Sequence, residues 1–175
     1  MKTRVLCAVM LLIVILTGCC SNTNSEDNLQ TQAPVVNTVA PTEKITVDYD
    51  LNEELAAVEA KCAEISEDTA EMTQAQMSIM AARLFEAWDD ELNSLWMRYI
   101  SLLDDNARAA AVSEENSWIA KKEAEVKSAG EQYEGGSMRP MVMSDTAKNL
   151  TRERCYVIAG YIGDIVGQTV TMPNK

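Results

Sequence analysis

Cys19 is the residue whose preceding sequence most clearly indicates a covalent modification. Two positive charges, Lys2 and Arg4, precede an apolar run over residues 5–17, and Gly18 separates that run from the cysteine. The run is shorter than the roughly 20 residues that a membrane-spanning helix needs, and it has the flanks of a signal peptide. Small residues before a cysteine allow an extended chain to enter a peptidase cleft and present the thiol for acylation.

The stretch Leu16-Thr17-Gly18-Cys19 resembles the lipobox of bacterial lipoproteins, in which an apolar residue and two small residues precede the lipidated cysteine. The resemblance implies a lipoprotein signal peptide over residues 1–18 and a lipid anchor on Cys19. The protein would then be extracytoplasmic, on the bacterial cell membrane or the outer membrane. Two or more acyl chains make such anchoring stable. The alternative is an ordinary signal peptide with a chance cysteine.

The acidic composition limits the partners that we expect. The chain has 15 Lys and Arg against 27 Asp and Glu. Loss of residues 1–18 would remove Lys2 and Arg4 but no acid, so 13 basic residues would remain against 27 acidic ones, a net charge of −14. No nucleic-acid partner is expected, because phosphate binding needs clustered Lys and Arg. A cationic protein would suit this charge, although solubility alone also explains it.

The residue types needed for catalysis or metal binding are scarce. The chain has no histidine, which excludes His-based triads and counts against a catalytic zinc site. Cys20, Cys62 and Cys155 show no metal-ligand spacing. In the acidic run of residues 89–91, adjacent helical side chains would point to different faces, whereas glycosidase carboxylates converge about 5–10 Å apart. We therefore expect a protein that is not an enzyme, with no catalytic residue, metal, cofactor or small-molecule substrate.

The composition divides the rest of the chain into a tether, a helical domain and a tail. Residues 19–49 are rich in Ser, Asn, Thr, Gln and Pro, which predicts a lipid-anchored flexible tether. Good helix formers dominate residues 50–166, which form the predicted domain. The tail of residues 167–175 is expected to fray.

Apolar residues at three- and four-residue steps predict four helices, over residues 51–72, 74–103, 106–133 and 142–165. Thr73 is the expected cap of the second helix, and residues 137–141 are an expected loop. No alternating strand pattern is present, so the predicted fold class is all-α, a small bundle of about four helices. The expected buried residues of the third helix are Ala111, Trp118, Ile119, Val126, Ala129 and Tyr133. Those of the fourth are Ala147, Leu150, Arg154, Val157, Ile158 and Tyr161.

Three stretches in this domain carry a family resemblance. The first is Thr73-Gln-Ala-Gln-Met-Ser78, followed by Trp88-Asp-Asp-Glu-Leu-Asn93. The second is Glu115-Asn-Ser-Trp118-Ile119-Ala-Lys-Lys122-Glu123. The third is Tyr133-Glu-Gly-Gly-Ser-Met-Arg-Pro-Met141, followed by Leu150-Thr151-Arg-Glu-Arg154. In order and spacing they resemble the N-terminal domain of lysozyme inhibitor LprI-like proteins, small helical proteins of the bacterial envelope. The resemblance covers about residues 72–160.

These motif residues favour a structural role. Lys122 lies four residues after Trp118, so its stem can pack over the indole. Glu123 is expected to pair with Arg154, because arginine suits carboxylates. The expected structural set is Trp88, Leu92, Asn93, Trp118, Ile119, Lys122, Glu123 and Arg154.

A second, functional interpretation concerns the turn between the third and fourth helices. Loops on a rigid scaffold often carry recognition, so this turn is the expected contact with a protein partner. The candidate partner-binding residues are Glu131, Glu134, Gly135, Gly136, Ser137 and Arg139.

The chain also departs from the family pattern. The family usually has cysteines where this chain has Met80, Val126 and Thr146, and a glutamine where it has Glu115. The remaining Cys62 and Cys155 could bridge the first helix to the fourth, or could be two unpaired buried thiols.

The resemblance implies an extracytoplasmic binding lipoprotein that binds and inhibits a cationic protein such as lysozyme. The alternative is a structural or adaptor lipoprotein of the envelope with an unknown protein partner. A glycan hydrolase ranks last, because nothing in the sequence brings two carboxylates together.

Overall fold

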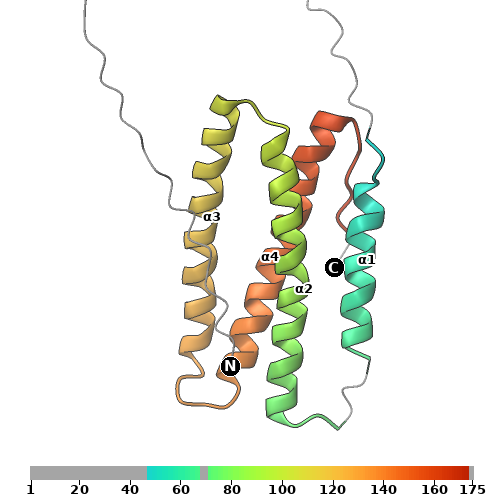
Figure 1. The fold of residues 1–175 in the computed structure, drawn as a ribbon. Coiled ribbons are helices and arrows are strands. Elements are labelled where there is room, and N and C mark those ends of the chain that lie inside the picture. Colours follow the sequence, from blue (N-terminus) through green and yellow to red (C-terminus); the bar gives the residue numbers. More distant parts are fainter. Residues whose placement is uncertain (1–46, 68–70, 174–175) are drawn as a thin grey trace, which may run out of the picture. The chain divides into compact units, whose positions relative to one another are not determined.

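The computed structural model describes residues 47–67 and 71–173, so the expected signal peptide and Cys19 lie outside the described residues. Four helices and no strand occur in this part of the chain: α1 (Leu51–Ile65), α2 (Gln74–Ser101), α3 (Asp105–Glu131) and α4 (Arg139–Val166). The predicted all-α bundle is therefore confirmed (Figure 1). None of the described helices is long and apolar enough to cross a membrane.

Polar caps set the starts of three helices. Thr73 caps α2 as predicted, because its hydroxyl accepts the N–H of Gln76 and the Gln76 side chain accepts the N–H of Thr73 at 2.8 Å. Asp50 and Asp104 accept N–H groups in the first turns of α1 and α3. Each cap satisfies helix N–H groups that have no partner within the helix.

Two predicted boundaries were wrong. α1 ends at Ile65 rather than at residue 72. The N–H of Ser66 donates to the Ala63 carbonyl and closes the last turn of the helix. α4 begins at Arg139 rather than at residue 142, so Pro140 lies in its first turn and not in a loop. Proline is tolerated there because a helix leaves the first N–H groups without partners in any case.

Helix α4 is the centre of the bundle. It packs against the other three helices, most extensively against α2 (Figure 1). Thr151, Cys155, Ala159 and Ile162 are therefore buried, although the apolar stripe predicted from the sequence did not include them. Val157, which that stripe did include, is 38% exposed. The prediction assumed one buried face, whereas α4 is covered on most of its circumference.

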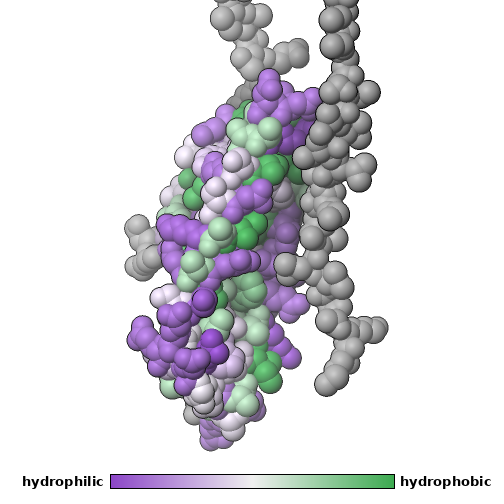
Figure 2. All heavy atoms as spheres, turned by 90° about the vertical axis from the view of Figure 1, so that its left-hand side faces the viewer, coloured by the Kyte–Doolittle hydropathy of each residue, from purple (hydrophilic) through white to green (hydrophobic). Residues whose placement is uncertain are grey.

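Helix α3 is mostly polar and packs chiefly on α4. Its buried residues are Ala111, Glu115 and Gly130, while Trp118 is half-buried and Ile119 is exposed, contrary to prediction. Figure 2 shows this side of the molecule, where hydrophilic side chains cover much of the surface and apolar ones are scattered among them. Because α4 covers only a narrow face of α3, the adjacent residues Trp118 and Ile119 are not both buried.

The tail after α4, which was expected to fray, is held by hydrogen bonds as far as Thr171. The Leu51 N–H donates to Gln168 Oε1 at 3.0 Å, and Gln168 Nε2 donates to the Tyr49 carbonyl at 2.6 Å. Asn52 bonds to the backbone of both Thr169 and Thr171. Val47 and Tyr49, which the composition assigned to the tether, pack against the core. The segment before α1 and the segment after α4 are therefore joined by hydrogen bonds near the start of α1.

Helix α1 is fastened to α2 by buried leucines and by one ion pair. Leu51 and Leu55 are fully buried. Arg98 of α2 donates two hydrogen bonds to the Glu54 carboxylate, at 2.6 and 2.9 Å. Glu91 of α2 lies beside this pair. Burial, and then the charge of Glu54 and a hydrogen bond to it, raise the pKa of Glu91 to about 7, although the charge of Arg98 acts in the opposite direction.

We therefore expect the domain to lose stability as the pH rises from about 4.5 to about 7. In that window folded Glu91 keeps a proton that the unfolded chain has already released, so unfolding becomes easier with each rise in pH. The loss should be roughly 1–2 kcal/mol, after allowance for the partial exposure of Glu91. Melting temperatures from circular dichroism at pH 5 and pH 7.5 measure it. The Glu91→Gln variant should lack this drop, and an unchanged pH profile in that variant would contradict the assignment.

Candidate functional site

The family motifs of α3 and α4 meet in an ion-pair cluster, which we call the Arg154 clamp: Arg154, Glu114, Glu115 and Tyr161. Arg154 is buried, and its Nε and Nη2 atoms donate to Glu115 Oε2 at 2.9 and 2.7 Å. Its Nη1 atom lies 2.9 Å from Glu114 Oε1, which also accepts the Tyr161 hydroxyl at 3.1 Å. One guanidinium therefore ties two successive residues of α3 to α4.

The electrostatics of the clamp favour the charged form of Arg154. Burial opposes that charge, but the hydrogen bonds and charges of Glu115 and Glu114 outweigh it, so the pKa of Arg154 lies above its ordinary value. The pKa of Tyr161 is also raised, by burial first and then by its hydrogen bond to Glu114. The hydroxyl of Tyr161 therefore stays protonated and remains a donor to the clamp.

The predicted pairing of Glu123 with Arg154 is wrong. Glu123 is exposed, and Arg154 pairs with Glu114 and Glu115 instead. Glu123 lies eight residues beyond Glu115, which is about 80° around the helix and about 12 Å along it. The sequence offered no signal that could choose among these acids, because the choice depends on how far α3 is shifted along α4.

Trp118 and Lys122 extend the clamp toward α2. The Arg154 guanidinium lies 5.5 Å from the centroid of the Trp118 ring, and Lys122 Nζ lies 4.9 Å from it. Lys122 Nζ is also 5.6 Å from the Phe85 ring of α2. Lys122 thus lies over the indole, as its spacing from Trp118 predicts. Two cations already occupy positions close to this ring, which favours a structural role for Trp118.

The motif residues of α2 are part of the scaffold. Trp88 and Leu92 belong to the buried core. Asn93 is exposed, and its Nδ2 atom donates to the Asp89 carbonyl at 2.7 Å, one turn earlier in the same helix.

The two cysteines of the domain are free thiols and form no bridge. Cys155 is fully buried, and its Sγ donates to the Trp88 carbonyl at 3.4 Å, while Cys62 is half-buried. Burial is the main cause that raises the pKa of both thiols. Because the thiolate is the nucleophile, neither cysteine is suited to nucleophilic chemistry.

The expected partner-binding residues form one turn at an end of the bundle (Figure 1). Glu131 and Glu134 are exposed, as are Gly135, Gly136 and Ser137. Gly135 has a φ of 73°, in the left-handed region that glycine adopts without strain. Arg139 differs, because it is half-buried in the first turn of α4, against Gly130 of α3. The turn therefore presents two acids, with its arginine partly covered.

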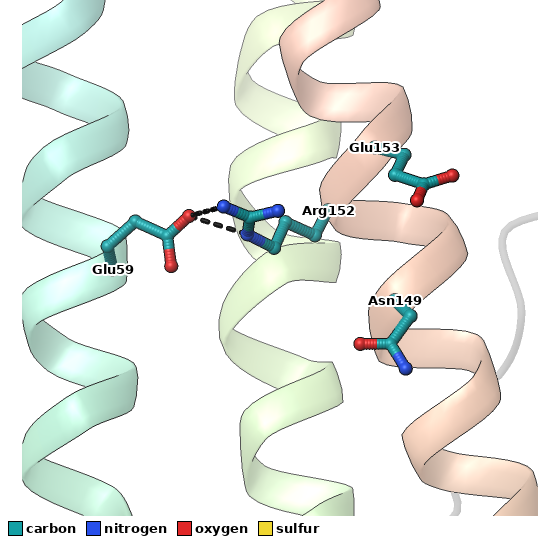
Figure 3. A pocket seen from close by; sticks show the side chains of 4 residues that line it. All are labelled: Glu59, Asn149, Arg152 and Glu153. Carbon is teal, nitrogen blue, oxygen red and sulfur yellow. Dashed lines mark hydrogen bonds and ion pairs between the residues drawn. The ribbon is translucent and has the colours of Figure 1, made fainter. Parts of the chain in front are cut away.

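A hollow of about 390 Å³ lies between α1 and α4, lined by Glu59, Asn149, Arg152 and Glu153. Figure 3 shows Glu59 and Arg152 reaching toward each other, with Glu153 turned to the other side. Arg152 pairs with Glu59 at 2.5 Å, and the Tyr156 hydroxyl donates to the same carboxylate at 3.1 Å. Burial, and then Glu59, raise the pKa of Tyr156 to about 12.

This hollow shows the limit of sequence reasoning about the site. The pair of Glu59 and Arg152 joins residues 93 positions apart, so no local pattern could reveal it. The carboxylate and the guanidinium already neutralise each other, and the described residues contain no group of three side chains suited to a metal ion.

Removing the arginine from the Arg154 clamp should lower the free energy of unfolding of the domain. The Arg154→Met variant leaves Glu115 with an unpaired charge next to α4, and we expect a loss of about 3 kcal/mol in unfolding free energy, typical of a broken buried pair. Glu115→Gln is the matched control, because the amide oxygen can still accept from Arg154. Urea unfolding curves measure both variants, and equal stability of Arg154→Met and the native protein would refute the clamp.

Comparison with known families adds evidence of a different kind. The family model described as lysozyme inhibitor LprI matches residues 65–157, more than half of the chain. The match includes all of α2 and α3, most of α4, and only the last residue of α1. Comparisons with curated proteins and with solved structures gave no match. The matched residues include the capping box of α2, the Arg154 clamp apart from Tyr161, and the turn at Gly135, and the chain therefore belongs to the lysozyme inhibitor LprI family.

Proposed function

We propose that this protein binds a lysozyme reversibly and inhibits it, and performs no catalysis of its own. The observation that carries the proposal is the family match, which covers α2, α3 and most of α4. At the level of the family, the function is that of a lysozyme inhibitor and not of an enzyme. An inhibitor that covers or plugs a cleft needs a rigid scaffold and an accessible contact surface, and no reactive group.

Charge supports a cationic partner. The net charge of the chain is −12, and lysozymes of host origin are commonly cationic. Opposite charges speed the encounter of two proteins. The turn between α3 and α4 is the proposed contact, because Glu131 at the end of α3 and Glu134 in the loop are both exposed, and two long helices hold that loop.

Location is a second part of the proposal. A lipid on Cys19 would anchor the protein outside the cytoplasm, on the bacterial cell membrane or the outer membrane. A tether of about 30 residues has a typical end-to-end distance of roughly 30 Å, enough to hold the domain clear of the lipid headgroups. The domain would then be available to bind lysozyme outside the cytoplasm.

Binding to lysozyme should be measurable by calorimetry and should weaken with salt, because charges at the rim of an interface are screened over about 8 Å at physiological ionic strength. Glu134→Lys should weaken binding several-fold. Asp90→Lys makes the same change of charge on an exposed residue of α2 and should have a smaller effect. Absence of binding at high micromolar protein would exclude lysozyme and leave the adaptor function in its place.

Anchoring can be tested separately in cells. Cys19→Ser should abolish the incorporation of labelled fatty acid and move the protein out of the detergent phase. Cys20→Ser, at the neighbouring thiol, should leave both unchanged. Continued lipidation of the Cys19→Ser variant would show that the lipobox assignment is wrong.

A further inference from the structure

The methionines of the chain are gathered near one end of the bundle. Six of the ten lie in two short segments, residues 72–80 and 138–143. The first segment contains the start of α2 and the second contains the start of α4, and Figure 1 shows both starts at the same end as the turn between α3 and α4. Gln74 Nε2 of α2 donates to the sulfur of Met141 at 3.6 Å, so the two segments are in contact. Thioether sulfur is therefore concentrated beside the turn.

Met143 of this group packs directly against the backbone of α3. A Cβ atom built at Gly130 would lie 2.8 Å from both Cγ and Sδ of Met143, so the thioether fills the space that a side chain at residue 130 would take. Glycine is unfavourable inside a helix relative to alanine, and this close approach explains its presence here. Gly130 is also the buried residue of α3 that lies nearest the turn. Its contact with Met143 therefore fixes the end of α3 from which the turn starts.

A thioether in this position is open to oxidation. Met143 is half-buried, so part of the residue is in contact with solvent and a small oxidant such as hydrogen peroxide has access to it. The sulfur attacks one oxygen of the peroxide, the O–O bond breaks and an S–O bond forms. The proton of the transferred oxygen passes to the departing hydroxide, which leaves as water. The sulfur loses two electrons, the peroxide gains them, and the product is methionine sulfoxide.

A sulfoxide at Met143 is incompatible with the contact at Gly130. The sulfur already lies against the helix backbone, so an added oxygen has no room on that side. Oxidation also turns an apolar side chain into a polar one, which disrupts packing. Met141 differs, because its sulfur already accepts a hydrogen bond from Gln74 and a sulfoxide oxygen can accept the same bond. The consequences of oxidation should therefore depend on Met143 in particular.

We propose that Met143 is a redox-sensitive site, whose oxidation by a peroxide releases the end of α3 and disorders the turn between α3 and α4. Because that turn is the proposed contact with lysozyme, oxidation also weakens binding. This second effect rests on the proposed function, whereas the release of α3 does not. A methionine sulfoxide reductase reverses the change with two thiols, which leave as a disulfide while the oxygen leaves as water.

The test compares native protein with two variants that replace methionine by leucine. Met143→Leu removes the sulfur and nearly keeps the side-chain volume. Met97→Leu is the matched control, because Met97 of α2 is 65% exposed and lies outside the two methionine segments. Each protein is treated with hydrogen peroxide and compared with its own untreated sample. Tandem mass spectrometry locates the sulfoxides, and hydrogen exchange reports the opening of the backbone over residues 128–138.

We expect exchange over residues 128–138 to become about tenfold faster after oxidation of native protein and of Met97→Leu, and to change less than about twofold in Met143→Leu. Treatment with the reductase should restore the slow exchange. Lysozyme binding, measured by calorimetry, should weaken about fivefold on oxidation of native protein, because a disordered contact must be ordered again on binding. The Met143→Leu variant should keep its affinity.

Three results would overturn the redox site. Met143 might as well be inert if it stayed a thioether while Met97 was fully oxidised. Unchanged exchange in native protein that carries a sulfoxide at Met143 would show that the contact tolerates the added oxygen. Equal acceleration in Met143→Leu and native protein would assign the effect to another methionine.

The lysozyme measurement separates this site from the proposed function. Absence of lysozyme binding by untreated protein would reject the proposed function, and the exchange data would still decide whether Met143 controls the turn. Unchanged affinity for lysozyme together with faster exchange would support the redox site and overturn its control of binding.

Discussion

The contact of Arg154 with Glu114 and Glu115 determines where α3 lies, and several other features depend on it. A helix with a broad apolar face is positioned by the packing of many side chains, but α3 has only three buried residues. Hydrophobic attraction between so few atoms allows a helix to slide, whereas two charge-assisted bonds from one planar guanidinium allow a single register. The turn that follows α3 takes its position from this register.

The opposite side of α4 is built in another way. Leu51 and Leu55 of α1 are buried in the core, and Arg98 and Arg152 form ion pairs that join its glutamates to α2 and α4. Arg98, Arg152 and Arg154 are thus committed to ion pairs between helices.

Local features of this fold could be predicted from the sequence, and pairings between helices could not. The cap at Thr73 and the turn at Gly135 depend on neighbouring residues, so residue types alone indicated them. The burial of α4 depended on three partners at once, which a single apolar stripe does not describe. The partners of Arg154 lie 39 and 40 positions away along the chain, and a helix shifted by two turns would have selected Glu123 instead. The hydrogen bonds between Asn52 and the tail after α4 also join residues that are far apart in the sequence, so they depend on tertiary structure.

The central claim is that this acidic helical scaffold acts on lysozyme by binding alone. The most direct measurement is the release of label from peptidoglycan by lysozyme at increasing concentrations of the purified protein. The account predicts that release falls to zero near one protein per lysozyme at low salt, recovers at high salt, and is absent when the protein is added without lysozyme. Undiminished release at a large excess of the protein, or release by the protein alone, would contradict it.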